Sequence, residues 1–156
     1  MKKSILIIAL AIVAAACNST KTANKTNGAD TTTVQAQTVA TVDLFDKEWK
    51  LKELNGKAIV LDTAFKREPH LLFNKETGQM SGNGGCNSFS GSYKLKDGNS
   101  IELSEGGATM MACPNLKIEG EFFEVLKQVK SFRIENNSLL LDNEKKETVA
   151  KLELGK

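Results

Sequence analysis

Residues 78–93 of the chain are Gly-Gln-Met-Ser-Gly-Asn-Gly-Gly-Cys-Asn-Ser-Phe-Ser-Gly-Ser-Tyr, and residues 106–114 are Gly-Gly-Ala-Thr-Met-Met-Ala-Cys-Pro. The whole stretch from Gly78 to Cys113 holds eight of the twelve glycines and two of the three cysteines. Glycine is favoured where the backbone needs a positive φ or where another strand approaches closely. This density predicts bulges and tight bends in a curved β-sheet.

The same glycines do not predict a phosphate site. Gly82-Asn83-Gly84 begins like a dinucleotide-binding fingerprint, but Asn87 stands at the third glycine position, and no Gly-Lys-Ser/Thr of a P-loop follows. The sequence after these glycines also lacks the helix whose N-terminus would hold a phosphate. Nucleotide binding is therefore not expected here.

The N-terminus has the pattern of an export signal. Met1-Lys2-Lys3 is a short positive segment, and residues 4–16 form an apolar run that is shorter than the ~20 residues of a spanning helix. Ala14-Ala15-Ala16-Cys17 resembles a bacterial lipobox, which implies cleavage before Cys17 and lipid on its sulfur and amino group. We therefore predict a lipoprotein signal peptide at 1–16. The alternative is an ordinary signal peptide followed by a stray cysteine.

The charge balance argues against a nucleic-acid partner. The chain has 21 basic and 19 acidic side chains, and Lys2 and Lys3 belong to the leader, so the remainder is formally neutral. No basic stripe is left to recruit nucleic acid or anionic lipid. The expected membrane contact is the lipid on Cys17. We expect this lipid to anchor the chain in the outer membrane, with the protein facing the periplasm.

Two further parts follow the leader. Residues 17–43 are predicted to be a lipid-anchored disordered linker, since 18–43 contains eight threonines, no aromatic residue and no sustained hydrophobic period. Such a segment cannot bury enough surface to offset the entropy of ordering it. Residues 44–156 form the predicted folded domain.

The folded part is predicted to be mostly β-structure. Asn55-Gly56 and Asp97-Gly98-Asn99 are strong hairpin signals. Residues 86–90 are expected to be irregular, and 109–113 to be strand or extended loop. The alternating and β-branched segments give about eight short strands, drawn from 49–54, 57–61, 70–74, 79–84, 91–96, 100–104, 131–135, 138–141 and 146–154.

One convincing helix follows Pro114. Its apolar residues recur at helical spacing, Glu119 and Glu121 lie off that face near the positive end of the helix dipole, and Asn115 is a plausible N-cap. A helix this short must pack on the sheet. The fold class is therefore α+β, a highly curved antiparallel sheet around one helix. The apolar stripe consists of Ile118, Phe122, Val125, Leu126 and Val129.

Several of these motifs, in this order, resemble the META domain family, to which HslJ-like heat-shock lipoproteins belong. The resemblance covers about Leu44 to Leu154 and implies a cracked, highly curved barrel with one helix. It implies no catalytic residue, and it associates the chain with the bacterial envelope and stress tolerance. The motifs are Trp49-Lys50-Leu51, Leu54-Asn55-Gly56, Met80-Ser81-Gly82, the run from Gly85-Cys86-Asn87 to Tyr93, and Thr109-Met110-Met111-Ala112-Cys113.

The cysteines predict one disulfide. If Cys17 carries lipid, Cys86 and Cys113 remain as an even pair in an oxidising compartment. One predicted hairpin lies between them, so its two ends can lie side by side, as a bridge requires. The alternative is two buried free thiols, which behave as small hydrophobic groups.

Catalytic and metal-binding patterns are weak. His70 is the only histidine, and no Gly-x-Ser-x-Gly is present, which disfavours a serine hydrolase. No close-spaced ligand pair predicts zinc, so we expect no metal and no cofactor. Glu102 and Glu105 are expected to be solvated charges. Apolar side chains, namely Met110, Met111, Trp49 and Tyr93, are expected to fill the core.

Two functions remain open from sequence. The first is a non-catalytic envelope lipoprotein that binds a protein partner or a small apolar ligand and supports envelope integrity. The second is an envelope hydrolase that uses carboxylates or His70. A pocket lined only by apolar groups would favour binding, whereas one that joins His70 to a carboxylate would favour the enzyme. Ligand-binding residues and oligomeric state are not predicted.

Overall fold

The computed structural model describes residues 43–156, apart from 62, 64, 66 and 115. These residues form nine strands and one helix, so the α+β prediction is confirmed. The predicted signal peptide, Cys17 and the linker lie outside the described residues. The elements are β1 (Glu48–Leu54), β2 (Lys57–Ala58), β3 (His70–Phe73), β4 (Gln79–Asn83), β5 (Ser88–Leu95), β6 (Ile101–Ala108), α1 (Lys117–Gln128), β7 (Ser131–Glu135), β8 (Ser138–Asp142) and β9 (Thr148–Leu154).

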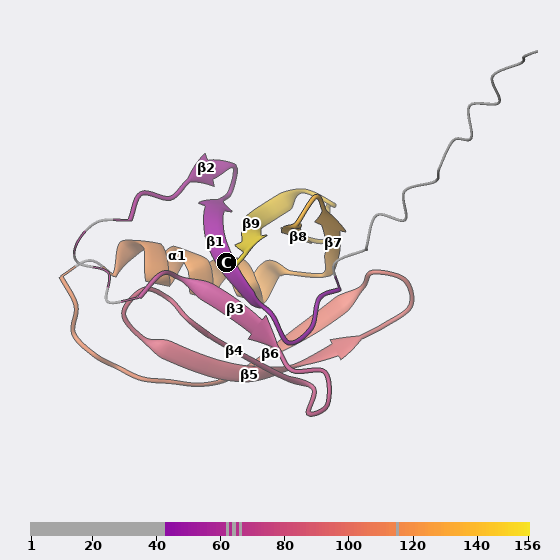
Figure 1. The fold of residues 1–156 in the computed structure, drawn as a ribbon, viewed down its shortest axis with the longest axis horizontal. Coiled ribbons are helices and arrows are strands. Elements are labelled where there is room, and N and C mark those ends of the chain that lie inside the picture. The colour runs from indigo at the N-terminus through magenta and orange to yellow at the C-terminus, as the bar shows by residue number, and fades with distance from the viewer. Residues whose placement is uncertain (1–42, 62, 64, 66, 115) are drawn as a thin grey trace, which may run out of the picture. The chain divides into compact units, whose positions relative to one another are not determined.

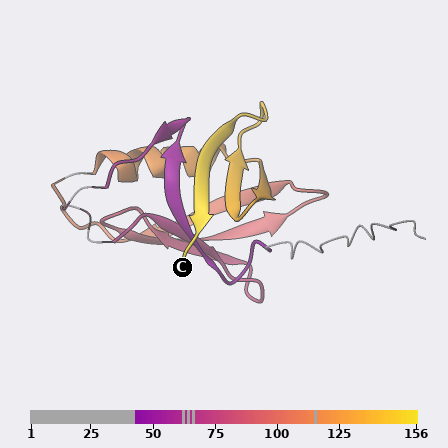
Figure 2. The ribbon, with the colours of Figure 1, turned by 45° about the horizontal axis from the view of Figure 1, so that its top comes forward.

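All strands belong to one antiparallel sheet in the order β6-β5-β4-β3-β1-β9-β8-β7, with β2 paired to β1 (Figure 1). Strand β9 lies in the middle, between β1 and β8, so the first and last long strands are neighbours. The sheet curls until its two ends approach, and an isolated bridge joins Ser100 to Ser131. The result is the predicted cracked barrel, which Figure 2 shows from a second side.

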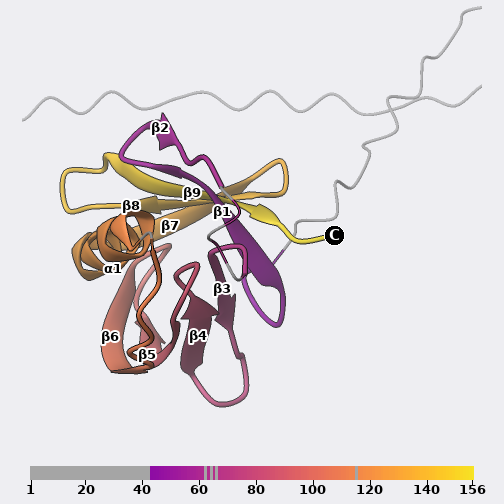
Figure 3. The same ribbon diagram turned by 90° about the vertical axis from the view of Figure 1, so that its left-hand side faces the viewer.

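Helix α1 lies in the opening between the two arms of the curled sheet, β3–β6 on one side and β7–β9 on the other (Figure 3). Most of its apolar stripe is buried as predicted: Phe122 is 0% exposed, and Val129, directly after the helix, is 2% exposed, while Ile118 is half-buried. Trp49 of β1 is also fully buried, and its indole Nε1–H donates to the carbonyl of Leu44 at 2.9 Å. Tyr93 is buried with them, which confirms the predicted core role of both aromatic residues.

The bounds of several elements differ from the prediction. Strand β5 already begins at Ser88, inside the segment expected to be irregular, and β6 continues to Ala108 instead of ending near Ser104. The predicted second strand keeps only Lys57 and Ala58. Residues 109–113 form an extended loop. The ends of these strands are set by pairing with neighbouring strands. Local sequence patterns do not show this pairing.

The helix begins differently from the expected cap. Asn115, the predicted N-cap, lies outside the described residues, and Leu116 stands at the N-cap position without a side-chain cap hydrogen bond. Glu119 lies in the first turn, where the helix dipole favours an acidic side chain. Helix α1, the only helix of the described part of the chain, is neither long nor apolar enough to cross a bilayer.

Candidate functional site

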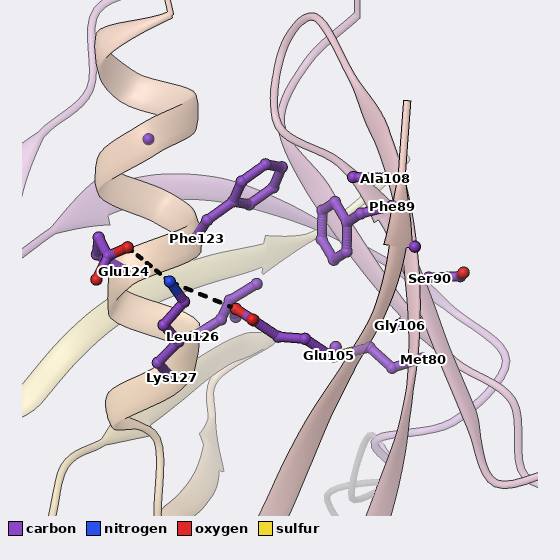
Figure 4. A pocket seen from close by; sticks show the side chains of 12 residues that line it. Met80, Phe89, Ser90, Glu105, Gly106, Ala108, Phe123, Glu124, Leu126 and Lys127 are labelled. Atoms are coloured by element: carbon purple, nitrogen blue, oxygen red, sulfur yellow. Dashed lines mark hydrogen bonds and ion pairs between the residues drawn. The ribbon is translucent and has the colours of Figure 1, made fainter. Parts of the chain in front are cut away.

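A cleft of about 260 Å³ separates the exposed flank of helix α1 from the ends of strands β5 and β6 (Figure 4). Phe89 of β5 and Phe123 of α1 both line it and contact each other edge-to-face, with ring centroids 5.1 Å apart and planes at 77°. Both rings are half-buried. Met80 and Leu126 also line the cleft, so its interior is mainly apolar.

The helical repeat produces one wall of the cleft. Gly120, Phe123 and Lys127 follow one another at three- and four-residue spacing, so they share one face of α1. The neighbouring stripe, which includes Phe122, points into the core. Phe89 contacts both stripes, because it also meets Phe122 edge-on at 6.1 Å between centroids. The cleft therefore opens directly beside the hydrophobic core.

Charged side chains stand at the mouth of the cleft. The Nζ of Lys127 lies 2.7 Å from Oε1 of Glu124 on the same helix and 4.0 Å from Oε1 of Glu105 on β6. The hydrogen bond that the Lys127 ammonium donates to Glu124, and then the nearby charge of Glu105, raise the pKa of Lys127. All three side chains are exposed, so these pairs add little stability. Figure 4 shows the ammonium between the two carboxylates.

Two glycines leave parts of the cleft walls without side chains. Gly107 lies in β6 and Gly120 in α1; neither has a positive φ, and a Cβ added to either would meet no atom within 4 Å. Glycine within a helix costs ~0.5–1 kcal/mol relative to alanine. Glycine within a strand often marks a place where a ligand or another backbone approaches. Neither a positive φ nor a close neighbouring atom explains why these two positions are glycine.

Beside the cleft, Glu119 fastens the start of the helix to the Gly-rich loop. Its carboxylate accepts hydrogen bonds from the backbone N–H of Cys86 at 3.1 Å, from the backbone N–H of Asn87 at 2.6 Å and from Nδ2 of Asn87 at 2.6 Å. Glu119 is 5% exposed. The expectation that it lies off the buried face is therefore wrong, because the folded loop supplies three donors for its carboxylate.

The disulfide strengthens the same junction. Cys86 and Cys113 are bonded, with Cα atoms 6.2 Å apart, which confirms the predicted pair over the alternative of free thiols. Cys86 precedes Asn87 in the loop that Glu119 holds. We call Glu119, Asn87 and the disulfide Cys86–Cys113 the lock.

Asn87 also holds the loop at 109–113. Its Oδ1 accepts from the backbone N–H of Met111 at 2.7 Å and from Oγ1 of Thr109 at 2.9 Å, while its Nδ2 donates to the carbonyl of Met111 at 3.3 Å. The loop runs over the surface, so Met110 is 98% exposed and Met111 is 41% exposed. The prediction that these methionines fill the core is wrong. The hydrogen bonds of Asn87 hold the backbone of their loop at the surface of the domain.

The other predicted candidates do not join the cleft. His70 lies in β3, half-buried, with Nδ1 2.8 Å from the carbonyl oxygen of Glu68. Glu102 forms an exposed ion pair with Lys96 at 3.0 Å, which lowers the pKa of its carboxyl. Glu105, expected to be a solvated charge, is exposed in β6 at the mouth of the cleft. Among the described residues no group of three or more His, Cys, Asp or Glu is arranged to hold a metal ion.

The sequence contained only a faint sign of the cleft. Gly120 interrupts an otherwise regular helical pattern, and Gly106-Gly107 follows a strand pattern, but either could mark a bend. Their position on opposite walls depends on the topology, which brings α1 back against β6. Phe123 appeared beside the apolar stripe and gave no indication of a site.

Comparison with solved structures finds relatives of the same fold. One is the NMR structure of a protein from Burkholderia xenovorans, with a TM-score of 0.55 and 28% identity over 72% of this chain and 83% of that one. Another NMR structure has a TM-score of 0.50 and 28% identity over 71% of this chain and 91% of that one. A comparison with curated proteins finds no match. The family model of the META domain matches residues 42–155, so the chain belongs to the META domain family.

Proposed function

We propose that this chain is a non-catalytic envelope lipoprotein whose META domain binds an apolar group of a partner or small ligand in the cleft between α1 and the β5–β6 arm. The observation that carries the proposal is the pair of glycines, Gly107 and Gly120, that leaves the cleft open beside the contacting rings of Phe89 and Phe123. An apolar interior with a few polar groups at its mouth is the usual form of a binding site.

The size of the cleft limits what it accepts. Its volume of about 260 Å³ lies just below the ~300–1,000 Å³ of pockets that enclose a whole drug-sized ligand. One aromatic ring system is therefore the best occupant. Phe89 and Phe123 would meet it edge-on or offset, which are the arrangements that aromatic pairs prefer.

The hydrolase alternative has less support. His70 does not line the cleft, and its Nδ1 faces a backbone carbonyl. The nearest carboxyl in sequence, that of Glu68, is bound by the ammonium groups of Lys50 and Lys52. The hydrogen bond from Lys50 lowers the pKa of Glu68, so this carboxylate is ionised and committed to ion pairs. Neither residue has the arrangement of an acid–base pair aimed at a substrate.

The proposed location in the cell envelope is supported by the N-terminal leader and by the disulfide. The lipobox-like Ala14-Ala15-Ala16-Cys17 motivates a lipid anchor, and a structural disulfide is typical of oxidising compartments such as the periplasm. The link to envelope integrity and stress tolerance is part of the proposal through the family resemblance.

An indole titration tests the binding site. The probe is added to the isotope-labelled chain, exported with Cys17→Ser so that it is purified without detergent, and amide shifts are followed by NMR. We expect shifts at Gly107, Gly120 and Phe123. Gly120→Leu should abolish them because its side chain fills the cleft, whereas the matched Gly120→Ala should keep them. Unchanged amides at millimolar indole would end the proposal.

Cys17→Ser tests the anchor separately. One acyl chain binds a membrane only marginally, so stable anchoring needs the several chains of a bacterial lipoprotein. The variant should leave the membrane fraction, while the wild-type chain stays there and carries the mass of the lipid. An unmodified Cys17 in the wild-type chain by mass spectrometry would refute the lipoprotein assignment without touching the cleft.

A further inference from the structure

Strand β6 presents an edge beside the cleft. In the described part of the chain β6 is the last strand of the sheet and pairs along its length with β5 alone. On its other side, the main-chain hydrogen bond among the described residues is at its start, where the N–H of Ile101 donates to the carbonyl of Lys130 at 3.0 Å, and the side chain of Glu105 reaches Lys127 of α1. Antiparallel strands alternate their hydrogen-bonding groups, so the main-chain groups of Leu103 and Glu105 also face outward.

This edge leads directly into the cleft. Glu105 belongs both to the outward-facing register of β6 and to the mouth of the cleft. The pairing with β5 shifts by one residue directly after it, between Gly91↔Glu105 and Phe89↔Ala108, and Gly107 lies in this shifted segment on the cleft wall. Because Gly107 has no side chain and a Cβ there would meet nothing within 4 Å, another backbone can approach β6 closely at this point. An exposed edge of this kind is a template for an added strand.

The dimensions and charges of the cleft limit the kind of partner that can bind there. The cleft, at about 260 Å³, has room for one aromatic side chain, which suits the single anchor residue of a peptide better than a whole ligand. Its mouth carries two carboxylates, Glu105 and Glu124, against the one ammonium of Lys127. A basic residue two positions from the anchor would lie on the same side of an extended peptide and meet this excess negative charge.

We propose that the META domain binds an extended peptide segment of a protein partner by strand addition to β6, with an aromatic side chain of that segment in the cleft and a neighbouring basic residue at the Glu105–Glu124 mouth. The inference rests on the proposed function, because it assigns an occupant to the same cleft. It adds the free edge of β6 as the second half of the site.

The probe is the acetylated and amidated heptapeptide Thr-Lys-Thr-Trp-Thr-Lys-Thr, titrated into the exported Cys17→Ser chain by calorimetry and NMR. Replacing its Trp by Ala should weaken binding at least tenfold. Replacing both Lys by Glu should weaken it several-fold, in a manner that added salt reduces. Equal affinity of all three peptides would overturn the inference.

Backbone methylation tests strand addition without altering the protein. Successive N–H groups of an extended peptide point to opposite edges, so methylating one alternating set removes the donors that face β6, and methylating the other set removes none. We expect one set to weaken binding at least tenfold and the other to change it less than twofold. Equal effects of the two sets would exclude pairing with β6.

A matched pair of variants at Glu105 tests whether the open edge of strand β6 takes part in binding. Glu105→Pro removes the outward N–H and the carboxylate, whereas Glu105→Thr removes the carboxylate alone. Peptide affinity should fall at least tenfold in the first variant and about threefold or less in the second. Retained indole binding would show that Glu105→Pro still folds with an intact cleft.

The outcomes separate the two proposals. If indole binds the cleft but the peptide does not, the cleft remains a binding site and the strand-addition inference fails. If octyl glucoside below its micellar concentration shifts the same amides while the peptide is inert, the occupant is an acyl chain and the inference also fails. If neither indole nor peptide shifts these amides, both proposals fail.

Discussion

The start of helix α1 and the flank that follows it meet the sheet in opposite ways. In the lock, the Glu119 carboxylate accepts three hydrogen bonds, and a covalent bond joins the loop to the segment before the helix. In the cleft, beginning one residue later at Gly120, space remains between helix and sheet. A gap beside a core normally costs packing energy. A firmly fixed helix end can therefore hold such a gap open.

The neighbours Phe122 and Phe123 give the largest contrast, since one faces the core and the other the cleft. Phe122→Ala should lower the free energy of unfolding by about 3–5 kcal/mol. Phe123→Ala should lower it by less than about 2 kcal/mol, because part of its ring is already in water. Urea denaturation of both variants measures the difference. Similar losses would mean that the cleft is packed as tightly as the core.

Breaking the disulfide should have the next largest effect. The bridge spans 27 residues, and closing such a loop stabilises the fold by about 3.5 kcal/mol in the chain-entropy model. The double variant Cys86→Ser, Cys113→Ser should therefore melt several degrees lower. The wild-type chain in reductant should melt at the same temperature as the double variant. No change in either sample would remove the disulfide from the lock.

Removing the carboxylate of the lock should cost somewhat less. Glu119→Ala leaves the buried N–H groups of Cys86 and Asn87 without their acceptor, and we expect a loss of about 2–3 kcal/mol. Glu119→Gln keeps an acceptor oxygen and should lose only about half as much. Faster amide hydrogen exchange at Cys86 and Asn87 in the alanine variant would locate the damage. A loss below about 0.5 kcal/mol would show that the lock is dispensable.

Alanine at matched glycines should give the smallest and most diagnostic effects. Gly120→Ala adds a methyl group to open space in a helix and should raise the free energy of unfolding by about 0.5–1 kcal/mol. Gly84→Ala would place its Cβ 2.6 Å from Cγ of Glu119 and should lower it by about 1–3 kcal/mol. Changes of the same sign would contradict the distinction between open cleft and closed lock.

The parts that local signals govern were predictable from the sequence. The helical spacing of Phe122, Val125 and Leu126 gave the buried face of α1, and Asn55-Gly56 gave a hairpin. The disulfide followed from the count of cysteines and the hairpin between them. In each case the evidence lies within one element or one pair of residues.

The site itself was not predictable in this way. Glu119 looked like a surface charge because its three donors come from a loop more than thirty residues away. Met110 looked like a core residue because composition does not reveal that Asn87 holds its loop on the surface. The cleft depends on where β6 and α1 meet, which no local pattern encodes.

The interior position of β9 makes the continuity of the sheet depend on this strand. Strand β9 is the pairing partner of both β1 and β8. Without it, β1 and β8 would each present an unpaired edge, and the β7–β8 hairpin would stay joined to the other strands through the isolated Ser100–Ser131 bridge. Loss of β9 would therefore open the sheet in its interior rather than trim it at an edge.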